Sequence, residues 1–588
     1  MVATAKKKDV VIVGLGWTGS IVGMELCKEG LEVLALERGD DRDTVPDFRY
    51  PNVADELKYG VRYALMQKPR NSTLTIRRTL GETALPYRAL GSFLPGDGIG
   101  GAGVHWNGNT FRPMAEELRL RSYVLENFGE SIISEGMTIQ DWGITYSELE
   151  PYFDRFEKVA GIAGKAGNIN GKIVESGNPF EAPRSGEYPM PPLPQTVDAL
   201  MFAEAARRMG YHPYPLPSGN ASEAYTNPYG MQLGPCSFCG FCDRFGCFNY
   251  SKSSPQTCIL DALKRKPNFE YRVNAEVLRV ELSPDHKTAT GVTYLTAEGA
   301  EVFQPADLVI LAAYQLHNVH LMLLSGIGKP YDPVSDEGIT GKNYAYQMTG
   351  STSLFFKDID FNPFVGAGSN GIVIDDFAIN RIDFGAHGFI GGSYICAGTS
   401  NGQPIRSMRL PTRTQSWGGQ WKQAIKEWYG HSMSIGSHGS NMSYRDSYLD
   451  LDPTYKDRYG RPLLRMTFNW KPNDIRMTQF MKTKIEAIAK SMNPDITESD
   501  YKSNGAMYDV RPYQTTHNVG GAIMGTDPNT SALNRYLQSW DVHNVFVMGA
   551  NAFPQNIQYN PTGMVGALAY WSVAAIRKDY LPNPRSLI

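Results

Sequence analysis

The sequence lacks any long uninterrupted apolar run. The longest candidate in its 588 residues is 308–324, which is interrupted by Gln315, His317, Asn318 and His320. A helix needs about 20 mainly apolar residues to cross a bilayer. We therefore expect no membrane-spanning segment of the chain's own.

The sequence also lacks an excess of either charge. It contains 57 Lys and Arg against 60 Asp and Glu, a formal net charge of -3 at pH 7. Basic residues are nowhere clustered and interleaved with aromatic ones. Because nucleic-acid binding requires a positive surface that neutralises phosphates, we expect no nucleic-acid partner.

The first motif that is present is a glycine turn between an apolar strand and a helix. An apolar run at 10–13 leads into Gly14, Gly16 and Gly19, and apolar residues in 20–27 fall on one helical face. Such glycines permit a tight turn, close approach of a pyrophosphate, and close packing of the helix on the strand. The helix N-terminus then faces the phosphates.

An acidic residue follows this motif at the distance that a nucleotide fold requires. A second apolar strand is predicted at 32–36 and is followed by Glu37. At roughly twenty residues beyond the turn, a carboxylate hydrogen-bonds an adenosine ribose and repels a 2′-phosphate. The sequence therefore predicts FAD or NAD and disfavours NADP, with a coincidental glycine turn as the alternative.

The lysines before this strand resemble the start of an export signal. Lys6, Lys7 and Lys8 precede the apolar run, as in a signal peptide. Cleavage after that run would remove the nucleotide site, so we expect no signal peptide. A protein working outside the cytoplasm would then need another polypeptide to carry it.

A second glycine-rich stretch spans 96–108. Its glycines, among them Gly100, Gly101 and Gly103, allow the backbone to lie flat against a planar or phosphorylated ligand. A plain connecting loop is the alternative interpretation.

The rest of the chain predicts at least two domains, since 588 residues exceed what one core usually serves. Segment 41–95 has the polar, punctuated pattern of loops and short helices over the nucleotide domain. We predict a helix at 146–159 and a last apolar helix within 513–574. Strands are predicted at 271–280, 288–294 and 307–313, and an antiparallel sheet over a cavity at 330–505.

Four of the seven cysteines lie close together, at Cys236, Cys239, Cys242 and Cys247. Structural zinc, disulfides and an iron-sulfur cluster are the three candidate interpretations. All-cysteine zinc sites usually come as separated pairs, and CxxC disulfides are strained, so the compressed spacing favours iron-sulfur. The sequence contains no CxxCH, which excludes covalently attached haem on this chain.

Several motifs together resemble the glucose-methanol-choline (GMC) flavoprotein oxidoreductases. They are GLGWTG at 14–19, GIGGAGVHWNG at 98–108, VILAAYQLHNVHLMLLSGIG at 309–328, YQTTHNVGGAIMG at 513–525 and NPTGMVGALAYWS at 560–572. More narrowly, the cysteine segment, 136–153 and 539–555 resemble the flavoprotein subunits of membrane-associated gluconate 2-dehydrogenases and their sugar-acid and polyol relatives.

The resemblance implies an α/β fold in which a doubly wound, Rossmann-type FAD domain faces an antiparallel-sheet substrate domain. The corresponding boundaries assign 1–150, 236–330 and 506–588 to the FAD domain, with the iron-sulfur segment at the start of 236–330. Segment 151–235 contributes substrate-domain and cap segments, and 331–505 is the substrate-binding domain.

The resemblance also implies FAD rather than NAD as the cofactor. The residues that match the family's cofactor-binding positions are Gly14, Gly16, Gly19, Glu37, Gly100, Gly101, Gly103, His105, Asn107, Ala550, Pro561 and Thr562. At His105 some members attach the flavin covalently, as the resemblance implies here. A histidine that only packs or hydrogen-bonds near the flavin ring is the alternative.

Alcohol oxidation by hydride transfer needs a base within hydrogen-bond reach of the hydroxyl, and histidine is the usual base at neutral pH. By the resemblance, His517 occupies the family's catalytic position and Asn560 that of its partner, which would hold the substrate oxygen. A carboxylate substrate would further require a basic side chain, for which Arg112 and Arg511 are candidates because they flank flavin-proximal segments.

The narrower resemblance implies a three-iron (3Fe-4S) cluster held by Cys236, Cys242 and Cys247, with Cys239 as a fourth ligand or a bystander. It implies oxidation of D-gluconate to 2-keto-D-gluconate, with electrons passing to a multihaem cytochrome c subunit and then quinone. A small subunit with a twin-arginine signal would carry the folded chain to the periplasmic face of the inner membrane. A polyol, sugar or 2-ketogluconate dehydrogenase, an oxidase using oxygen, and a non-catalytic redox-sensing flavoprotein remain alternatives.

Overall fold

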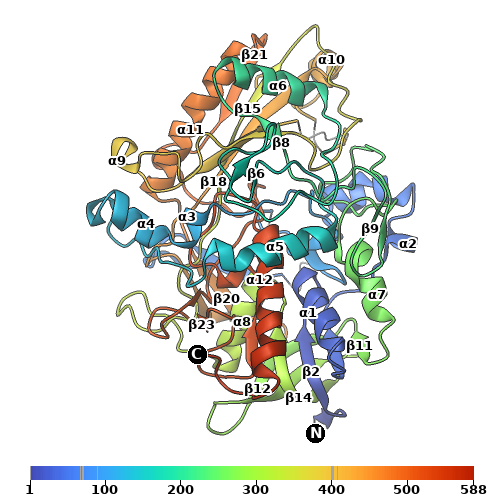
Figure 1. Cartoon of the computed structure of the whole chain (residues 1–588), viewed down its shortest axis with the longest axis vertical. Coiled ribbons are helices and arrows are strands. Elements are labelled where there is room, and N and C mark those ends of the chain that lie inside the picture. The colour runs from blue at the N-terminus through green and yellow to red at the C-terminus, as the bar shows by residue number, and fades with distance from the viewer. Residues whose placement is uncertain (1, 67, 69–71, 89–90, 399–402, 407) are drawn as a thin grey trace.

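The computed structural model describes residues 2–66, 68, 72–88, 91–398, 403–406 and 408–588. The chain folds into two lobes, with both termini in the lobe drawn at the bottom of Figure 1. Among the described residues, no helix combines the length and the apolar character that crossing a bilayer requires.

The lower lobe is built around the predicted strand, turn and helix. β2 (Lys8–Val13) leads through the glycine turn into α1 (Trp17–Cys27), every residue of which is buried, and β3 (Val33–Leu36) follows. β2 pairs in parallel with β3 on one side and with β14 (Glu301–Leu311) on the other. The motif therefore lies at the centre of the sheet.

The central sheet combines parallel and antiparallel strands. β11 (Phe269–Arg272), β3, β2, β14 and β24 (Val545–Val547) run parallel, whereas β12 (Glu276–Leu282) and β13 (Ala289–Leu295) continue beyond β14 as antiparallel neighbours. The short strand β1 (Ala3–Thr4) also pairs with β14. Ligands of such sheets bind at the carboxyl ends of the parallel strands.

The prediction of a single strand at 271–280 is wrong. The structure divides it into β11 and β12, which lie at opposite ends of the sheet. Between them Asn274 adopts a positive φ of 52°, and its backbone N–H donates to Gly39. Asn tolerates this conformation, so the chain turns there without the Gly or Pro that marks most breaks.

Three helices pack together beside the central sheet. α12 (Thr562–Ala575) contacts both α1 and α5 (Tyr146–Ala160), which crosses between the lobes in Figure 1. The helix predicted at 146–159 is confirmed. A capping box of Thr145 and Glu148 begins it, and Gly161 with φ of 64° ends it. α8 (Gln315–Ser325) follows β14.

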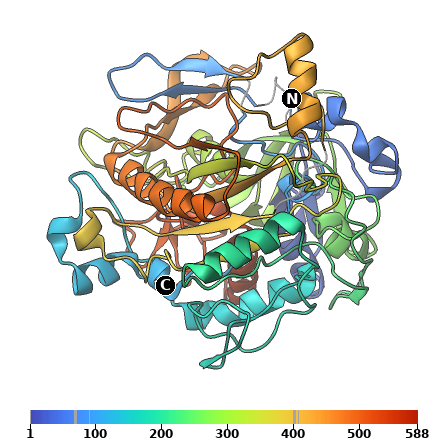
Figure 2. The same ribbon diagram turned by 90° about the horizontal axis from the view of Figure 1, so that it is seen from above.

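The upper lobe contains a six-stranded antiparallel sheet. Its order is β21 (Ile496–Asp500), β15 (Met348–Phe355), β18 (Ser432–Gly439), β17 (Ser393–Ala397), β16 (Ile372–Ile374) and β8 (Tyr214–Pro215). α6 (Val197–Arg208) and α11 (Pro472–Ser491) contact each other and pack on this sheet, as Figure 2 shows. The predicted α/β fold with an antiparallel second sheet is confirmed, whereas the domain boundaries stay a prediction.

A third sheet, of four strands, joins distant parts of the chain. It has the order β19 (Tyr448–Lys456), β20 (Pro462–Thr467), β4 (Leu74–Arg77) and β5 (Leu85–Tyr87). Two strands therefore lie in the segment for which the sequence indicated loops and short helices. The smaller elements are α2 (Thr44–Asp47), α3 (Ala115–Leu118), α4 (Leu120–Asn127), α7 (Asp261–Lys264), α9 (Phe384–His387), α10 (Gly419–Trp428), and the strand pairs β6 (Asn168–Ile169) with β7 (Lys172–Ile173), β9 (Tyr225–Thr226) with β10 (Gln232–Leu233), and β22 (Met524–Gly525) with β23 (Leu533–Asn534).

Candidate active site

A cavity of about 1220 Å³ gathers most of the predicted site residues. Its lining comes from the glycine turn, the second glycine loop, α8, β18 and the two C-terminal stretches. The predicted residues that line it are Gly14, Gly16, Glu37, Gly101, Gly103, His105, Asn107, His517, Ala550, Asn560, Pro561 and Thr562.

The two glycine motifs face each other in this cavity. Gly100 donates its backbone N–H to Leu15 at 2.8 Å, and a Cβ at Gly101 would lie 3.4 Å from the Cα of Gly16. A Cβ at Gly16 would meet nothing closer than 3.8 Å, so open space remains above the start of α1. Because a helix N-terminus with free N–H groups binds phosphate, this cradle fits the pyrophosphate of FAD.

Gly19 and Gly100 do not line the cavity. At each of these two positions close packing leaves no room for a Cβ atom. A Cβ at Gly19 would lie 2.1 Å from the carbonyl oxygen of Gly14, which the close approach of α1 to the turn forbids. Gly100 has φ of 89°, and a Cβ there would clash with the side chain of Gln256 at 2.3 Å. Both positions shape the loops without contacting the cavity.

Glu37 lies at the cavity wall directly after β3. Its carboxylate accepts hydrogen bonds from the backbone N–H groups of Leu15 at 3.1 Å and Gly39 at 2.9 Å. The side chain is buried, and this burial raises its pKa. Since the carboxylate is fixed beside the glycine turn and lines the cavity, it is placed to accept hydrogen bonds from a ribose.

The imidazole of His517 and the amide of Asn560 meet at the cavity wall. Nε2 of His517 lies 3.3 Å from Nδ2 of Asn560, and Nδ1 of His517 contacts Oε1 of Gln347. Backbone pairing between Val519 and Ala345 brings His517 and Gln347 together. This arrangement leaves Nε2 as the ring nitrogen that faces the cavity.

His438 is a second imidazole in the same wall, and sequence reasoning missed it. It lies on β18, and its Nδ1 is 3.1 Å from the same Oε1 of Gln347. Its ring stacks on Tyr394 with centroids 5.2 Å apart and an interplanar angle of 2°. Tyr394 in turn donates its hydroxyl to Oδ1 of Asn560 at 2.6 Å.

Burial keeps both imidazoles neutral. It holds the pKa of His517 well below its usual range, and a charge on His438 would lower it further. Burial also lowers the pKa of His438 to about 4. At neutral pH both rings therefore have one protonated and one free nitrogen, as a general base requires.

His105 lies in the second glycine loop, where its Nε2 hydrogen-bonds the carbonyl oxygen of Leu94 at 3.1 Å. Its Nδ1 is buried and has no hydrogen-bond partner in the described part of the chain. Burial lowers the pKa of His105 to about 3, so the ring is neutral at pH 7 and one ring nitrogen carries a free lone pair. A cavity-lining imidazole with an unused nitrogen fits a flavin attachment, which stays a prediction.

The four clustered cysteines lie within electrostatic reach of one another. Burial above all raises the pKa of Cys242 to about 12, and the thiols of Cys236, Cys239 and Cys247 act in the same direction. Among the residues that the structure describes, no three His, Cys, Asp or Glu side chains converge closely enough to hold one metal ion.

The cysteine segment is hydrogen-bonded to the loop that contains His105. The buried Nζ of Lys252 donates to the carbonyl oxygens of Trp106 at 2.7 Å, Cys242 at 2.8 Å and Phe245 at 2.6 Å. The backbone N–H of Arg244 donates to the carbonyl oxygen of His105 at 2.8 Å. The cysteines are therefore adjacent to the predicted flavin loop.

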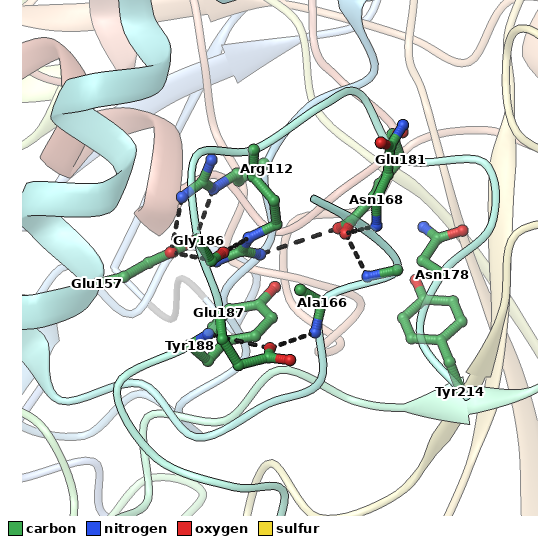
Figure 3. Close-up of polar contacts among 12 residues, drawn as sticks. Arg112, Glu157, Ala166, Asn168, Asn178, Glu181, Gly186, Glu187, Tyr188 and Tyr214 are labelled. Atoms are coloured by element: carbon green, nitrogen blue, oxygen red, sulfur yellow. Dashed lines mark hydrogen bonds and ion pairs between the residues drawn. The ribbon is translucent and has the colours of Figure 1, made fainter. Parts of the chain in front are cut away.

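The structure does not place Arg112 or Arg511 in the cavity lining, so neither is positioned to bind a substrate carboxylate. Arg112 forms a bidentate ion pair with Glu157, with both distances 2.8 Å, inside the buried polar network of Figure 3. Arg511 lies on the surface beside Asp509, at 2.7 Å. Both predictions were wrong because the carboxylate partners are apparent only in three dimensions.

Arg244 is one of several basic residues of the cavity wall, and sequence reasoning did not select it. Its guanidinium packs over the rings of Tyr513 at 4.0 Å and Tyr63 at 5.5 Å. The side chain is buried, and Nε and Nη2 have no hydrogen-bond partner among the described residues. Nε also lies 3.8 Å from a carboxylate oxygen of Asp243. In general, this edge of a guanidinium can bind a carboxylate with two parallel hydrogen bonds.

Comparison with known proteins agrees with this geometry. Residues 142–349 and 443–569 match two models of the GMC oxidoreductase family. The gluconate 2-dehydrogenase flavoprotein of Pantoea cypripedii is 54% identical over 99% of this chain and 95% of its own length. The 2-methyl-1,2-propanediol dehydrogenase of Mycolicibacterium austroafricanum is 25% identical over 97% of this chain and 95% of its own length.

Among solved structures, pyridoxine 4-oxidase from Mesorbium loti has a TM-score of 0.58 at 16% identity, covering 97% of this chain and 99% of its own. This likeness supports the fold. The family matches support the cofactor and the reaction class that the cavity indicates. The chain therefore belongs to the GMC oxidoreductase family and is an FAD-dependent oxidoreductase that acts on CH–OH donors.

Proposed function

We propose that this chain is the flavoprotein subunit of a sugar-acid dehydrogenase that oxidises D-gluconate to 2-keto-D-gluconate. The pairing of His517 with Asn560 in the cofactor cavity is the observation that carries an alcohol-oxidising function. The substrate is supported by the 54% identity to a gluconate 2-dehydrogenase flavoprotein.

In this proposal His517 and Asn560 act on the same substrate hydroxyl. Nε2 of His517 accepts the hydroxyl proton, and Nδ2 of Asn560 donates to the oxygen as negative charge develops there. A bound flavin would supply the hydride acceptor, and an alcohol that gives its proton to His517 and its hydride to that acceptor becomes a ketone. Because burial lowers its pKa, the imidazole is unprotonated at neutral pH and has a free nitrogen for the proton.

Arg244 is the residue that we propose binds the substrate carboxylate. A sugar acid needs a positive partner, and a buried guanidinium edge that makes no hydrogen bond to the described residues would gain from a substrate carboxylate. The backbone hydrogen bond from Arg244 to His105 puts Arg244 next to the predicted flavin loop. The substrate carboxylate would then lie on the flavin side of the cavity.

We propose that the cysteine segment holds an iron-sulfur cluster, and the compressed spacing of its four cysteines supports this choice over a single zinc ion. We propose Cys236, Cys242 and Cys247 as ligands, with Cys239 as a fourth ligand or a bystander. A bound cluster supplies one-electron transfer between a two-electron donor and a haem acceptor. Lys252 and Arg244 hold the cysteine segment against the His105 loop and so keep the two cofactor sites adjacent.

The proposed electron acceptor is a multihaem cytochrome c subunit that passes electrons to quinone. We further propose that a small subunit with a twin-arginine signal carries the chain to the periplasmic face of the inner membrane. The match to a protein named as the flavoprotein of its dehydrogenase supports the existence of other subunits. Covalent attachment of FAD through His105 belongs to the same proposal.

A substrate panel tests this function. The purified holoenzyme is supplied with an artificial electron acceptor and with D-gluconate, 2-ketogluconate, other sugar acids and neutral polyols. We expect the highest kcat/KM with D-gluconate and 2-keto-D-gluconate as the product. Faster oxidation of a neutral polyol, or peroxide formation in air at the rate of substrate oxidation, would contradict the proposal.

A further inference from the structure

Gln347 connects the two imidazoles of the cavity wall. It is fully buried and immediately precedes β15. Its Nε2 faces three backbone carbonyl oxygens, of Ile557 at 3.5 Å, Gln558 at 3.2 Å and Tyr559 at 3.2 Å. An amide nitrogen can only donate, so these carbonyls fix which end of the amide is nitrogen and which is oxygen.

The amide oxygen of Gln347 therefore accepts hydrogen bonds from both histidines. It contacts Nδ1 of His517 and lies 3.1 Å from Nδ1 of His438. A carbonyl oxygen has two lone pairs and no proton, so each Nδ1 must be the protonated nitrogen. A neutral imidazole has one protonated nitrogen and one acceptor nitrogen, so Nε2 is the acceptor in both rings.

Both acceptor nitrogens are oriented by further contacts. Tyr394 donates to Oδ1 of Asn560, which turns Nδ2 of Asn560 toward Nε2 of His517. Tyr394 also stacks on His438 and fixes the plane of its ring. Within the described residues Nε2 of His438 has no hydrogen-bond partner, although the ring lines the cavity. An acceptor with no partner inside the protein can accept a hydrogen bond from a ligand or from water in the cavity.

The distance between the rings suits one small substrate. The centroids of His438 and His517 lie 6.0 Å apart and the ring planes are inclined by 44°. Two hydroxyls on neighbouring carbons can each donate to one of two imidazole rings that neighbour each other in this way. A lone hydroxyl would leave His438 without a donor.

We propose that Gln347 is a positioning residue that sets the tautomer of both imidazoles, and that His438 binds a second hydroxyl on the carbon next to the one oxidised. The substrate class is then a vicinal diol, in which one hydroxyl gives its proton to His517 and the neighbouring hydroxyl donates to His438. This inference rests on the proposed function for its choice of probe, D-gluconate, but the tautomers do not depend on that substrate.

The tautomers are tested without catalysis. Holoenzyme with ¹⁵N-labelled histidine is compared with Gln347→Leu and Gln347→Glu by the nitrogen chemical shifts of the His517 and His438 rings, assigned from His517→Ala and His438→Phe. We expect Nδ1–H in wild type and in Gln347→Glu, which keeps an acceptor, and loss of that single tautomer in Gln347→Leu. Nε2–H tautomers in wild type, or the same shifts in wild type and Gln347→Leu, would overturn the positioning role.

The pH profile separates positioning from a merely structural role. His438 is the titratable side chain whose charge bears on His517, and a carboxylate at position 347 would add an opposite charge that stabilises the imidazolium. We expect the acidic limb of kcat to move to higher pH in Gln347→Glu. For Gln347→Leu we expect at least a tenfold lower kcat. The proposal would be contradicted if the acidic limb of kcat did not move in Gln347→Glu and Gln347→Leu kept the wild-type kcat.

The vicinal hydroxyl is tested with a matched pair of substrates and variants. D-gluconate and 3-deoxy-D-gluconate differ only in the hydroxyl next to the oxidised carbon, and His438→Phe keeps the stacked ring while removing Nε2. We expect wild type to prefer D-gluconate by about tenfold in kcat/KM, the effect of one hydrogen bond, and the variant to lose most of that preference. Equal discrimination in both enzymes would overturn the role of His438, whereas failure of wild type to oxidise either sugar acid would refute the proposed function instead.

Discussion

Nε2 of His517 and Nδ2 of Asn560 lie 3.3 Å apart. Each of these two side chains is also hydrogen-bonded by a residue from a different segment of the upper lobe. Gln347, at the start of β15, contacts the imidazole, and Tyr394 on β17 contacts the amide. The pair is thus oriented before any substrate arrives. Such pre-organisation lowers the entropic cost of reaching the transition state.

Replacing the base should abolish most turnover. We expect His517→Ala to lower kcat by about 10²- to 10⁴-fold, the usual contribution of a general base. Flavin absorbance should be unchanged, because His517 is only one of many residues that line the cavity. The control is His212→Ala, an exposed histidine paired with Asp376. Near-normal turnover in His517→Ala would exclude it as the base.

Removing the hydroxyl of Tyr394 should have a smaller effect on the same step. Tyr394→Phe keeps the stacked ring and removes the donor to Oδ1 of Asn560. Because the amide is then free to rotate, we expect kcat to fall by about tenfold, the effect of one neutral hydrogen bond, with KM little changed. Steady-state kinetics decide this, and a change confined to KM would contradict the positioning of Asn560 by Tyr394.

Arg244 should set the preference for acidic substrates. We expect Arg244→Gln to raise KM for D-gluconate by about tenfold to a hundredfold, because a charge-assisted hydrogen bond contributes about 1.5–3 kcal/mol. Oxidation of neutral polyols should be unaffected. Arg511→Gln, at an exposed site, is the matched control. If both substrate classes lose activity equally, Arg244 has another role.

Metal analysis decides among the interpretations of the cysteine segment. We expect the anaerobically purified protein to contain iron and acid-labile sulfide with an iron-sulfur EPR signal. Cys242→Ser should lose that signal and keep the flavin, whereas Cys396→Ser, outside the cluster of cysteines, should keep both. Zinc without iron in the wild-type protein would remove the electron-transfer role of this segment.

Acid should destabilise the fold through its histidines. Burial lowers the pKa of His320 from 6.5 to about 4, so between these values the unfolded chain binds a proton that the folded chain does not. The free energy of unfolding then decreases as pH falls from about 6.5 to about 4. Nε2 of His320 hydrogen-bonds the carbonyl oxygen of Pro462 at 2.9 Å, and Gln can keep that bond.

Denaturant unfolding at a series of pH values measures this effect. We expect His320→Gln to reduce the number of protons linked to unfolding by up to about one. An identical pH dependence in wild type and His320→Gln would show that His320 does not contribute.

The nucleotide half of the site is encoded locally and was therefore readable from the sequence. Gly14, Gly16 and Glu37 lie within one strand, turn, helix and strand, so their spacing determines their arrangement. The segments containing His517 and Asn560 were identified by the family resemblance. Their meeting in one cavity agrees with that expectation, although their catalytic roles stay predictions.

The substrate half depends on contacts between segments that are distant in the chain. Gln347 and His438 carry no local motif, and they meet only because β15 pairs with β18. Arg112 failed as a substrate residue because Glu157 on α5 neutralises it. Polar and apolar alternation in β18 was the one signal that could have placed His438 on the cavity face of its sheet.

Anaerobic mixing of the holoenzyme with D-gluconate tests the central claim most directly, because it follows flavin reduction without any electron acceptor. We expect the oxidised-flavin absorbance of the wild type to bleach in a single turnover, at a rate lowered by about 10²-fold or more in His517→Ala. Absence of bleaching in wild type, or equal rates in the two proteins, would contradict the account.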